Sequence, residues 1–259
     1  MSTLVWILSF TLLGGLLSTL AASIFLVMSA GARGRLLPHL ISFATGALLG
    51  AAFLGLLPHA IDDAGLDKLH AIGATVLGGI LIFFLLEKLV LWRHCHLDEC
   101  EAHGPQERHR AAASGTLILV GDGIHNLLDG MLIAAAFLTD VHLGIVTALA
   151  VIAHEIPQEV GDLAVLLNGG MSRGRALLCN LMTGLAAVAG GVLAYFWFEA
   201  AEELQPYVLA VAASSFLYVA VADLIPGLHR RIGARSSLTQ IILIGAGVGV
   251  IYATHSTLH

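Results

Sequence analysis

The sequence predicts an all-α membrane protein with eight transmembrane helices, built as a single domain over residues 1–259. Hydrophobic residues make up 58% of the chain and charged residues only 12%, and the mean hydropathy is +0.89. A water-soluble domain of this length does not have such a composition. Apolar stretches long enough to cross a bilayer, about 20 residues each, recur along the whole chain. We therefore expect one polytopic domain.

Eight apolar stretches define the expected helices. They cover residues 4–28, 38–60, 69–92, 114–138, 142–167, 174–198, 204–226 and 237–256. The first has neither a basic start nor a small-residue cleavage site, so we expect a retained helix and not a signal peptide. The connections are short except for residues 93–113, which link the third and fourth stretches.

Lysine and arginine lie almost entirely in alternate connections, which predicts the orientation. One set of connections carries Arg33, Arg35, Lys88, Arg93, Arg108, Arg110, Arg173, Arg175, Arg230, Arg231 and Arg235. The other set carries Lys68 together with Asp62, Asp63, Asp67, Asp140, Glu199, Glu202 and Glu203. Basic connections face the cytoplasm, so we expect both termini on the extracytoplasmic side of a bacterial inner membrane.

Two short matches indicate an internal repeat. The second stretch ends with Pro58-His59, and the seventh ends with Pro226 followed by His229. These ends face opposite sides of the membrane in the predicted topology. They favour an inverted repeat in which the first three and last three helices surround a central pair, a 3+2+3 arrangement. Chance similarity is the alternative.

The fourth and fifth stretches carry ionisable residues at membrane depth, where such residues are costly and usually functional. The fourth reads Gly123-Ile-His125-Asn126-Leu-Leu-Asp129-Gly130, and the fifth reads His154-Glu155-Ile-Pro157-Gln158-Glu159-Val-Gly161-Asp162. Residues four apart share one face of a helix, so His125 pairs with Asp129 and His154 pairs with Gln158. Glu155, Glu159 and Asp162 form an adjacent polar stripe.

Only residues 139–141 join these two stretches, so their helices must be antiparallel neighbours. Imidazole, carboxylate and amide groups from both can then form one site for a divalent metal ion. The predicted ligands are His125, Asn126, Asp129, His154, Glu155, Gln158, Glu159 and Asp162. Hydrogen bonding between helices is the alternative, but such bonds contribute only ~0.6–2 kcal/mol each, less than the cost of the buried charges. The simplest function of a metal site in the middle of the membrane is to pass the metal ion across it.

Proline and glycine residues accompany the motifs. Pro157 cannot donate to the carbonyl of Ala153, which predicts a kink and a freed backbone oxygen. Four glycines are expected to let the helices pack closely and to leave room for an ion: Gly121, Gly123, Gly130 and Gly161. Asp122 is either a ligand-supporting residue or part of a helix end.

These motifs resemble those of the ZIP (Zrt-, Irt-like protein) family of divalent metal transporters. HNxxDG and HEIPxExGD are most similar to its HEIPHE-containing branch, in a short bacterial-type form, and residues 46–60 and 213–226 are similar to that branch's second and seventh helices. The resemblance implies eight helices, a binuclear-type site between the fourth and fifth, and transport toward the cytoplasm. It assigns His125, Asp129, His154 and Gln158 to one metal position and Asn126 and Glu155 to its neighbour.

The chain departs from the family pattern in three places. Ala51 and Gly55 stand where the second helix of the family has an Asp and a His, so the outer path lacks two polar side chains. Gln158 stands where the branch often has His, which weakens one ligand and shifts metal preference. The sixth stretch has no Glu, so the second metal position is expected to be weak or auxiliary.

We expect transport of Zn²⁺ toward the cytoplasm, with Fe²⁺, Mn²⁺ and Cd²⁺ as alternative ions, and neither a prosthetic group nor an enzymatic activity. Oxygen and imidazole ligands argue against Cu⁺. An intramembrane metal-dependent hydrolase is one rival, because His154-Glu155 begins like HExxH, but Gln158 stands at the last position. A metal sensor without flux is the other.

The remaining polar segments allow further expectations. The connection 93–113 contains His94, Cys95, His96, Cys100 and His103; such tracts bind zinc, so we expect a flexible metal acceptor or sensor, with an inert linker as the alternative. His59, with Asp62 and Asp63, either gathers cations at the entrance or ends a helix in solvent, whereas His255 and His259 are expected to be incidental.

Charge and cysteine content narrow the partners. The net charge of −6 comes without a basic stripe, so no nucleic acid partner is expected. Three cysteines give no disulfide framework. The lipid bilayer and divalent metal ions are the expected partners. The sequence leaves the oligomeric state open, with a homodimer as one alternative.

Overall fold

The computed structural model describes residues 2–95, 106–198, 202–229 and 233–258. Within these ranges all regular structure is helical, and eight segments are long and apolar enough to cross a membrane. These are Thr3–Val27, Gly31–Ala64, Leu66–Leu86, Ile118–Thr139, Val141–Leu167, Arg173–Phe198, Gln205–His229 and Arg235–Ser256. The prediction of an all-α polytopic membrane protein is confirmed.

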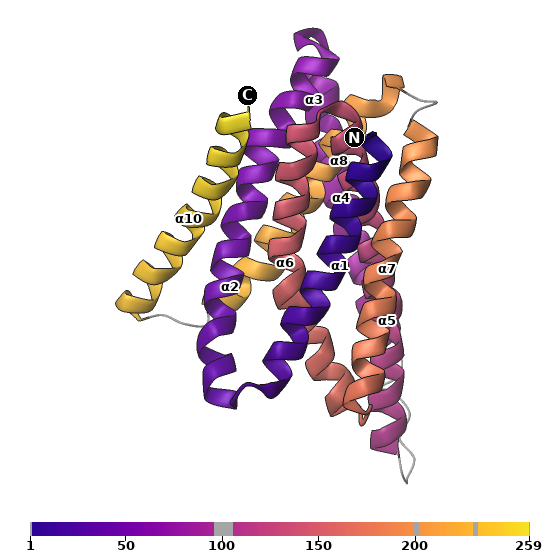
Figure 1. Ribbon diagram of the computed structural model, residues 1–259, viewed down its shortest axis with the longest axis vertical. Helices are drawn as coiled ribbons and strands as arrows, with labels where there is room; N and C mark the ends of the chain where they lie inside the picture. The colour runs from indigo at the N-terminus through magenta and orange to yellow at the C-terminus, as the bar shows by residue number, and fades with distance from the viewer. Residues whose placement is uncertain (1, 96–105, 199–201, 230–232, 259) are drawn as a thin grey trace.

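The helices run up and down along one long axis (Figure 1). In chain order they are α1 (Thr3–Val27), α2 (Ala30–Gly50), η1 (Ala51–Leu56), α3 (Leu57–Ala64), η2 (Leu66–Lys68), α4 (Leu69–Cys95), α5 (Gln106–Thr139), α6 (Val141–Asn168), α7 (Arg173–Phe198), η3 (Glu202–Leu204), α8 (Gln205–Tyr218), η4 (Val219–Leu224), α9 (Ile225–His229) and α10 (Ala234–Leu258). Both ends of the chain lie at the end of the bundle to which α3 points (Figure 1). We call this the termini end. The opposite end, where Arg33, Arg173 and Arg235 begin or precede helices, is the arginine end.

Two helices start earlier than predicted. α2 begins at Ala30 rather than near residue 38, and α5 begins at Gln106 rather than near 114. At α2, the hydroxyl of Ser29 accepts a hydrogen bond from the backbone N–H of Ala32 and so caps the helix. The hydropathy pattern marks only the part of a helix that is apolar enough for lipid, so it misses a polar first turn. The long connection 93–113 falls largely on residues 96–105, which lie outside the described residues.

Two π-helical segments occupy matching places in the second and seventh membrane-spanning segments. η1 ends at Leu56 and η4 ends at Leu224, and each ends two residues before a proline, Pro58 or Pro226. Proline removes a backbone donor and clashes with the preceding turn, and a local π turn is one of the adjustments that satisfy the freed backbone groups in transmembrane helices. The two short sequence matches thus share a local conformation. The 3+2+3 arrangement itself stays a prediction.

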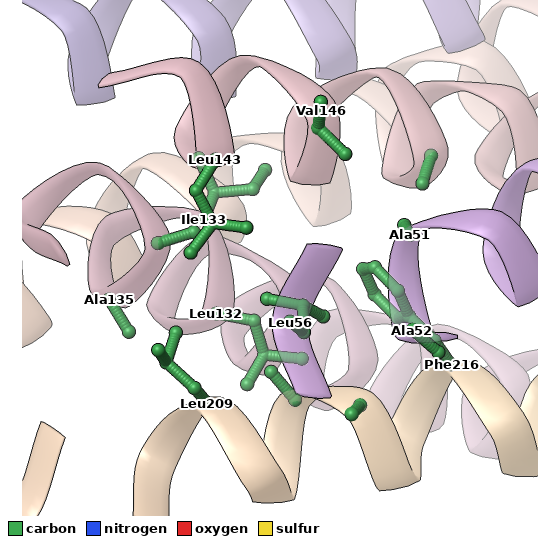
Figure 2. Packing of buried hydrophobic residues seen from close by; sticks show 14 of the residues in the cluster. Ala51, Ala52, Leu56, Leu132, Ile133, Ala135, Leu143, Val146, Leu209 and Phe216 are labelled. Atoms are coloured by element: carbon green, nitrogen blue, oxygen red, sulfur yellow. The ribbon is translucent and has the colours of Figure 1, made fainter. Parts of the chain in front are cut away.

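α6 lies in the centre of the bundle, where it contacts α1, α2, α5, α7 and α10 (Figure 1). The main apolar core packs α5 and α6 against η1 and α8. Figure 2 shows Ala51, Ala52 and Leu56 of η1 facing side chains from the other three helices. Those side chains include Leu132 and Ile133 of α5, Leu143 and Val146 of α6, and Leu209 and Phe216 of α8. The core therefore holds α5 and α6 in fixed register on the termini side of their polar motifs.

Close backbone contact joins α5 to α7. A Cβ atom at Gly130 would overlap the backbone carbonyl of Ala187, and one at Gly190 would overlap that of Leu127. Only glycine fits at such a crossing, because the two backbones touch. The expectation for Gly130 is therefore confirmed, whereas Gly121 and Gly161 have no neighbouring atom within 4 Å of an added Cβ.

Candidate metal centre

Four side chains from α5 and α6 converge in the interior of the bundle. Nε2 of His154 lies 3.2 Å from Oδ2 of Asp129 and 3.8 Å from Oε1 of Glu155. Nε2 of His125 lies 3.7 Å from the same Asp129 oxygen and 3.6 Å from the same Glu155 oxygen. The two Nε2 atoms are 3.3 Å apart. Ligand atoms around a tetrahedral zinc ion are separated by about 3.4 Å, because each lies about 2.0–2.2 Å from the metal.

Hydrogen bonding orients His154 toward this group. Its Nδ1 lies 3.1 Å from the backbone carbonyl oxygen of Ala150. A carbonyl can only accept, so Nδ1 is the donor and the lone pair is on Nε2, the nitrogen that faces the other three groups. Histidine ligands of metals commonly have this arrangement, with the second ring nitrogen bonded to a carbonyl or carboxylate. Phe216 packs edge-on against the same ring, with 6.2 Å between the ring centroids.

The carboxylates of this group are buried without donors. Asp129 is 1% exposed and Glu155 is 3% exposed. Oδ2 of Asp129 and both oxygens of Glu155 have no hydrogen-bond partner. Buried carboxylate oxygens without partners are costly, and here they face imidazole lone pairs. A divalent cation between these four groups would supply the missing positive charge.

A second group lies one turn nearer the arginine end. Asp122, Glu155 and Glu159 each have a carboxylate oxygen within 4.8 Å of the others. Asp122 also joins both helices, since its Oδ1 accepts from Nδ2 of Asn126 at 3.0 Å and from Nε2 of Gln158 at 3.4 Å. Glu155 therefore belongs to both groups and connects them.

Glu159 is the most enclosed member of the second group. Its side chain is fully buried, and neither of its carboxylate oxygens has a donor. Asn180 of α7 lies beside it, with Nδ2 donating to the backbone carbonyl of Glu159 at 3.3 Å and Oδ1 buried without a partner. Asp162, one turn further along α6, is half-buried. The polar stripe on α6 thus continues from the site toward the arginine end.

The structure brings seven of the eight predicted residues into two adjoining groups, with differences in pairing, whereas Asp162 lies outside both groups. The i, i+4 spacing predicted Gln158 beside His154. In the structure Gln158 turns toward Asp122, and Glu155 lies beside His154 instead. Asn126 likewise donates to Asp122. Asp122 takes the ligand-supporting position that was one of its two predicted alternatives, whereas Asn180 was not predicted as a site residue. α6 is helical through Pro157 without a break.

Apolar packing separates the site from the termini end. Ala51 and Gly55, where the family pattern has polar residues, are buried in η1 against α6, and a Cβ at Gly55 would lie 3.3 Å from Leu143. Most buried residues of α5 and α6 between the motifs and the α5–α6 turn are apolar, including Leu132, Ile133, Ala136, Leu143, Val146 and Ala150, and Thr147 is a buried polar exception. Apolar side chains therefore predominate on the termini side of the site.

Comparison with known proteins gives consistent matches. The profile described as "ZIP Zinc transporter" matches residues 92–254, more than half of the chain. Zinc transporter zipt-7.1 of Caenorhabditis briggsae is 30% identical over 97% of this chain and 80% of that protein. Zinc transporter ZIP13 is 34% identical in Pongo abelii and 32% in Homo sapiens, each over 83% of this chain, which spans 66% and 70% of those proteins.

These matches cover both polar motifs and all of α5 to α8. They agree with the eight apolar helices and with a buried group of metal-ligand side chains. The chain belongs to the ZIP zinc transporter family, a family of membrane proteins that transport metal ions and are not enzymes.

Proposed function

We propose that this protein moves Zn²⁺, or a closely similar divalent ion, across the membrane through the site between α5 and α6. The observation that carries the proposal is the group formed by His125, Asp129, His154 and Glu155. In it each histidine Nε2 lies 3.2–3.8 Å from the other Nε2 and from the two carboxylates. Two imidazoles and two carboxylates suit Zn²⁺, Fe²⁺ and Mn²⁺ better than a soft monovalent ion. The names of the relatives, all zinc transporters, support zinc as the first of these.

The second group provides the next position for the ion. Asp122, Glu159 and Glu155 supply carboxylate oxygens, while Asn126 and Gln158 hold Asp122 in place. Because Glu155 is shared, an ion can move between the groups while keeping one ligand. Asp162 extends the path toward the arginine end. All eight predicted ligands thereby receive a role, with Asn126 and Gln158 as supporting residues in this conformation.

The direction of movement is proposed from charge and packing. Arginine-rich ends of transmembrane helices face the cytoplasm, so both termini lie outside it, as in a multi-pass protein of a bacterial inner membrane. The apolar core lies on the termini side of the site, while the polar stripe leads to the arginine end. At the termini end, a cavity of about 690 Å³ is lined by Asp63, Lys68 and Glu203 among others. Its acidic groups favour accumulation of cations before they enter.

Zinc uptake into proteoliposomes tests this function. Asp129→Asn keeps the side-chain volume but removes the charge that lies between both histidines, so zinc uptake should fall to background. Asp67→Asn is the matched control, because Asp67 is exposed in η2 and belongs to neither ligand group; its uptake should equal that of the unmodified protein. Undiminished uptake by Asp129→Asn would refute transport through this site.

A further inference from the structure

A pair of histidines lies at the termini end, far from the site between α5 and α6. His59 belongs to α3 and His255 belongs to the last turn of α10. Their ring centroids are 5.6 Å apart, and the ring planes are inclined by 49°. Both side chains are half-buried.

The separation of the two rings suits a shared metal ion. Two imidazoles on one tetrahedral zinc have centroids roughly 5 Å apart, because each ring nitrogen lies about 2.0–2.1 Å from the metal. The observed 5.6 Å is close to that value. The alternative is a purely apolar contact between the rings, which two polar imidazoles at a helix end suit less well than metal binding.

His59 is oriented in the manner of a metal ligand. Its Nδ1 lies 2.9 Å from the backbone carbonyl oxygen of Gly55. Nδ1 is therefore the donor, and the lone pair is on Nε2. His154 in the transport site has the same arrangement with the carbonyl of Ala150, and a backbone carbonyl is a usual partner for the second nitrogen of a ligand histidine.

The local charge also favours a cation. Asp63 is four residues after His59, on the same side of α3, and its carboxylate interacts electrostatically with the His59 ring. Asp62 is adjacent and exposed. A carboxylate oxygen from Asp63, or water, can complete the coordination that two imidazoles begin.

We propose that His59 and His255 bind a divalent transition-metal ion such as Zn²⁺ at the termini end. The bound ion joins α10 to α3, two helices far apart in sequence. This second site is independent of the site between α5 and α6, since it shares no residue with it.

Metal titration of the purified full-length protein tests the proposal. The background variant disrupts the other sites: His125→Ala, His154→Ala and Glu155→Gln between α5 and α6, where Glu155 belongs to both groups, with His94, Cys95, His96, Cys100 and His103 replaced in the connection. Isothermal titration should still detect about one Zn²⁺ per chain. Adding either His59→Ala or His255→Ala should abolish this binding, whereas His70→Ala should not, because His70 is an exposed histidine of α4 at the same end.

Two results would overturn the proposal: a background variant that binds no zinc, or zinc binding that survives either histidine substitution. A second pair of variants guards against loss of folding. In the same background, His59→Cys combined with His255→Cys should bind Cd²⁺ and show thiolate-to-cadmium absorption, whereas each single cysteine variant should show much less. If the double cysteine variant gives no more absorption than the single variants, the two positions cannot share an ion and the proposal fails.

Discussion

The Nε2 atoms of His125 and His154 face each other at 3.3 Å, although the residues are on different helices. His154 donates its Nδ1 proton to the Ala150 carbonyl, so its Nε2 presents a lone pair to the other ring. A metal ion between them would convert this contact into two coordinate bonds. The pair is completed by Asp129, whose Oδ2 lies within 3.7 Å of both nitrogens.

The first prediction concerns His154, which is 1% exposed and whose Nδ1 is hydrogen-bonded to the Ala150 carbonyl. His154→Ala should lower the initial rate of zinc uptake at least ~100-fold, the upper end of the cost of losing even a supporting residue of a metal site. Uptake by proteoliposomes measures the rate. His39→Ala, at an exposed position of α2, is the control and should transport normally. Comparable uptake by both variants would contradict the assignment.

The second prediction concerns Gln158, which turns toward Asp122 in the structure. Gln158→His adds an imidazole beside the carboxylates of Asp122 and Glu159, and imidazole binds zinc more tightly than a neutral amide. We expect a lower KM for zinc and a lower maximal rate, because tighter binding slows release. The measurement is the zinc dependence of uptake, with Gln240→His of α10 as the control. An unchanged KM would mean that residue 158 does not approach the ion.

The third prediction concerns the crossing of α5 and α7. Gly130→Ala would place a methyl group on the backbone of Ala187, so the helices must separate. Overpacking of this kind costs about 1–3 kcal/mol. Gly121→Ala is the matched control on the same helix, because its added methyl group has no neighbour within 4 Å and alanine favours a helix. Thermal unfolding in detergent should show a lower Tm only for Gly130→Ala; equal Tm values would mean that the crossing is looser than described.

The helices and the location of the site could be predicted from the sequence for a simple physical reason. A membrane requires about 20 apolar residues in each helix, and it makes residues such as Asp129 and Glu155 costly unless they have a purpose. The pattern of apolar and ionisable residues along the chain therefore predicts the number of helices and identifies the two that carry polar groups. The starts of α2 and α5 were missed because lipid does not constrain residues beyond the apolar core of the membrane.

The pairing of side chains within the site could not be predicted in the same way. Helical spacing places both Glu155 and Gln158 near His154, and only the position of Asp122 on α5 decides which of them turns away. The contact between His59 and His255 is even less accessible, since it depends on how α10 lies over η1 and α2. No sequence pattern near either histidine predicts that packing, and no functional role is therefore predicted for His255 from the sequence.

The last prediction is that zinc affinity falls with decreasing pH. His125 and His154 bind a metal only through a ring nitrogen that carries no proton, and Asp129 and Glu155 only as carboxylates, so protons compete with the ion. Each proton that must be released weakens binding by roughly tenfold per pH unit once the free site is protonated. Zinc titrations of the purified protein from about pH 8 down to about pH 5.5 should therefore show a steady loss of affinity. Repeating them in buffers of different ionisation enthalpy counts the protons released, and this count should decrease in His125→Ala but not in His39→Ala. Binding that is equally tight across the whole range, with no proton release, would exclude the histidines as ligands and with them the transport site described for α5 and α6.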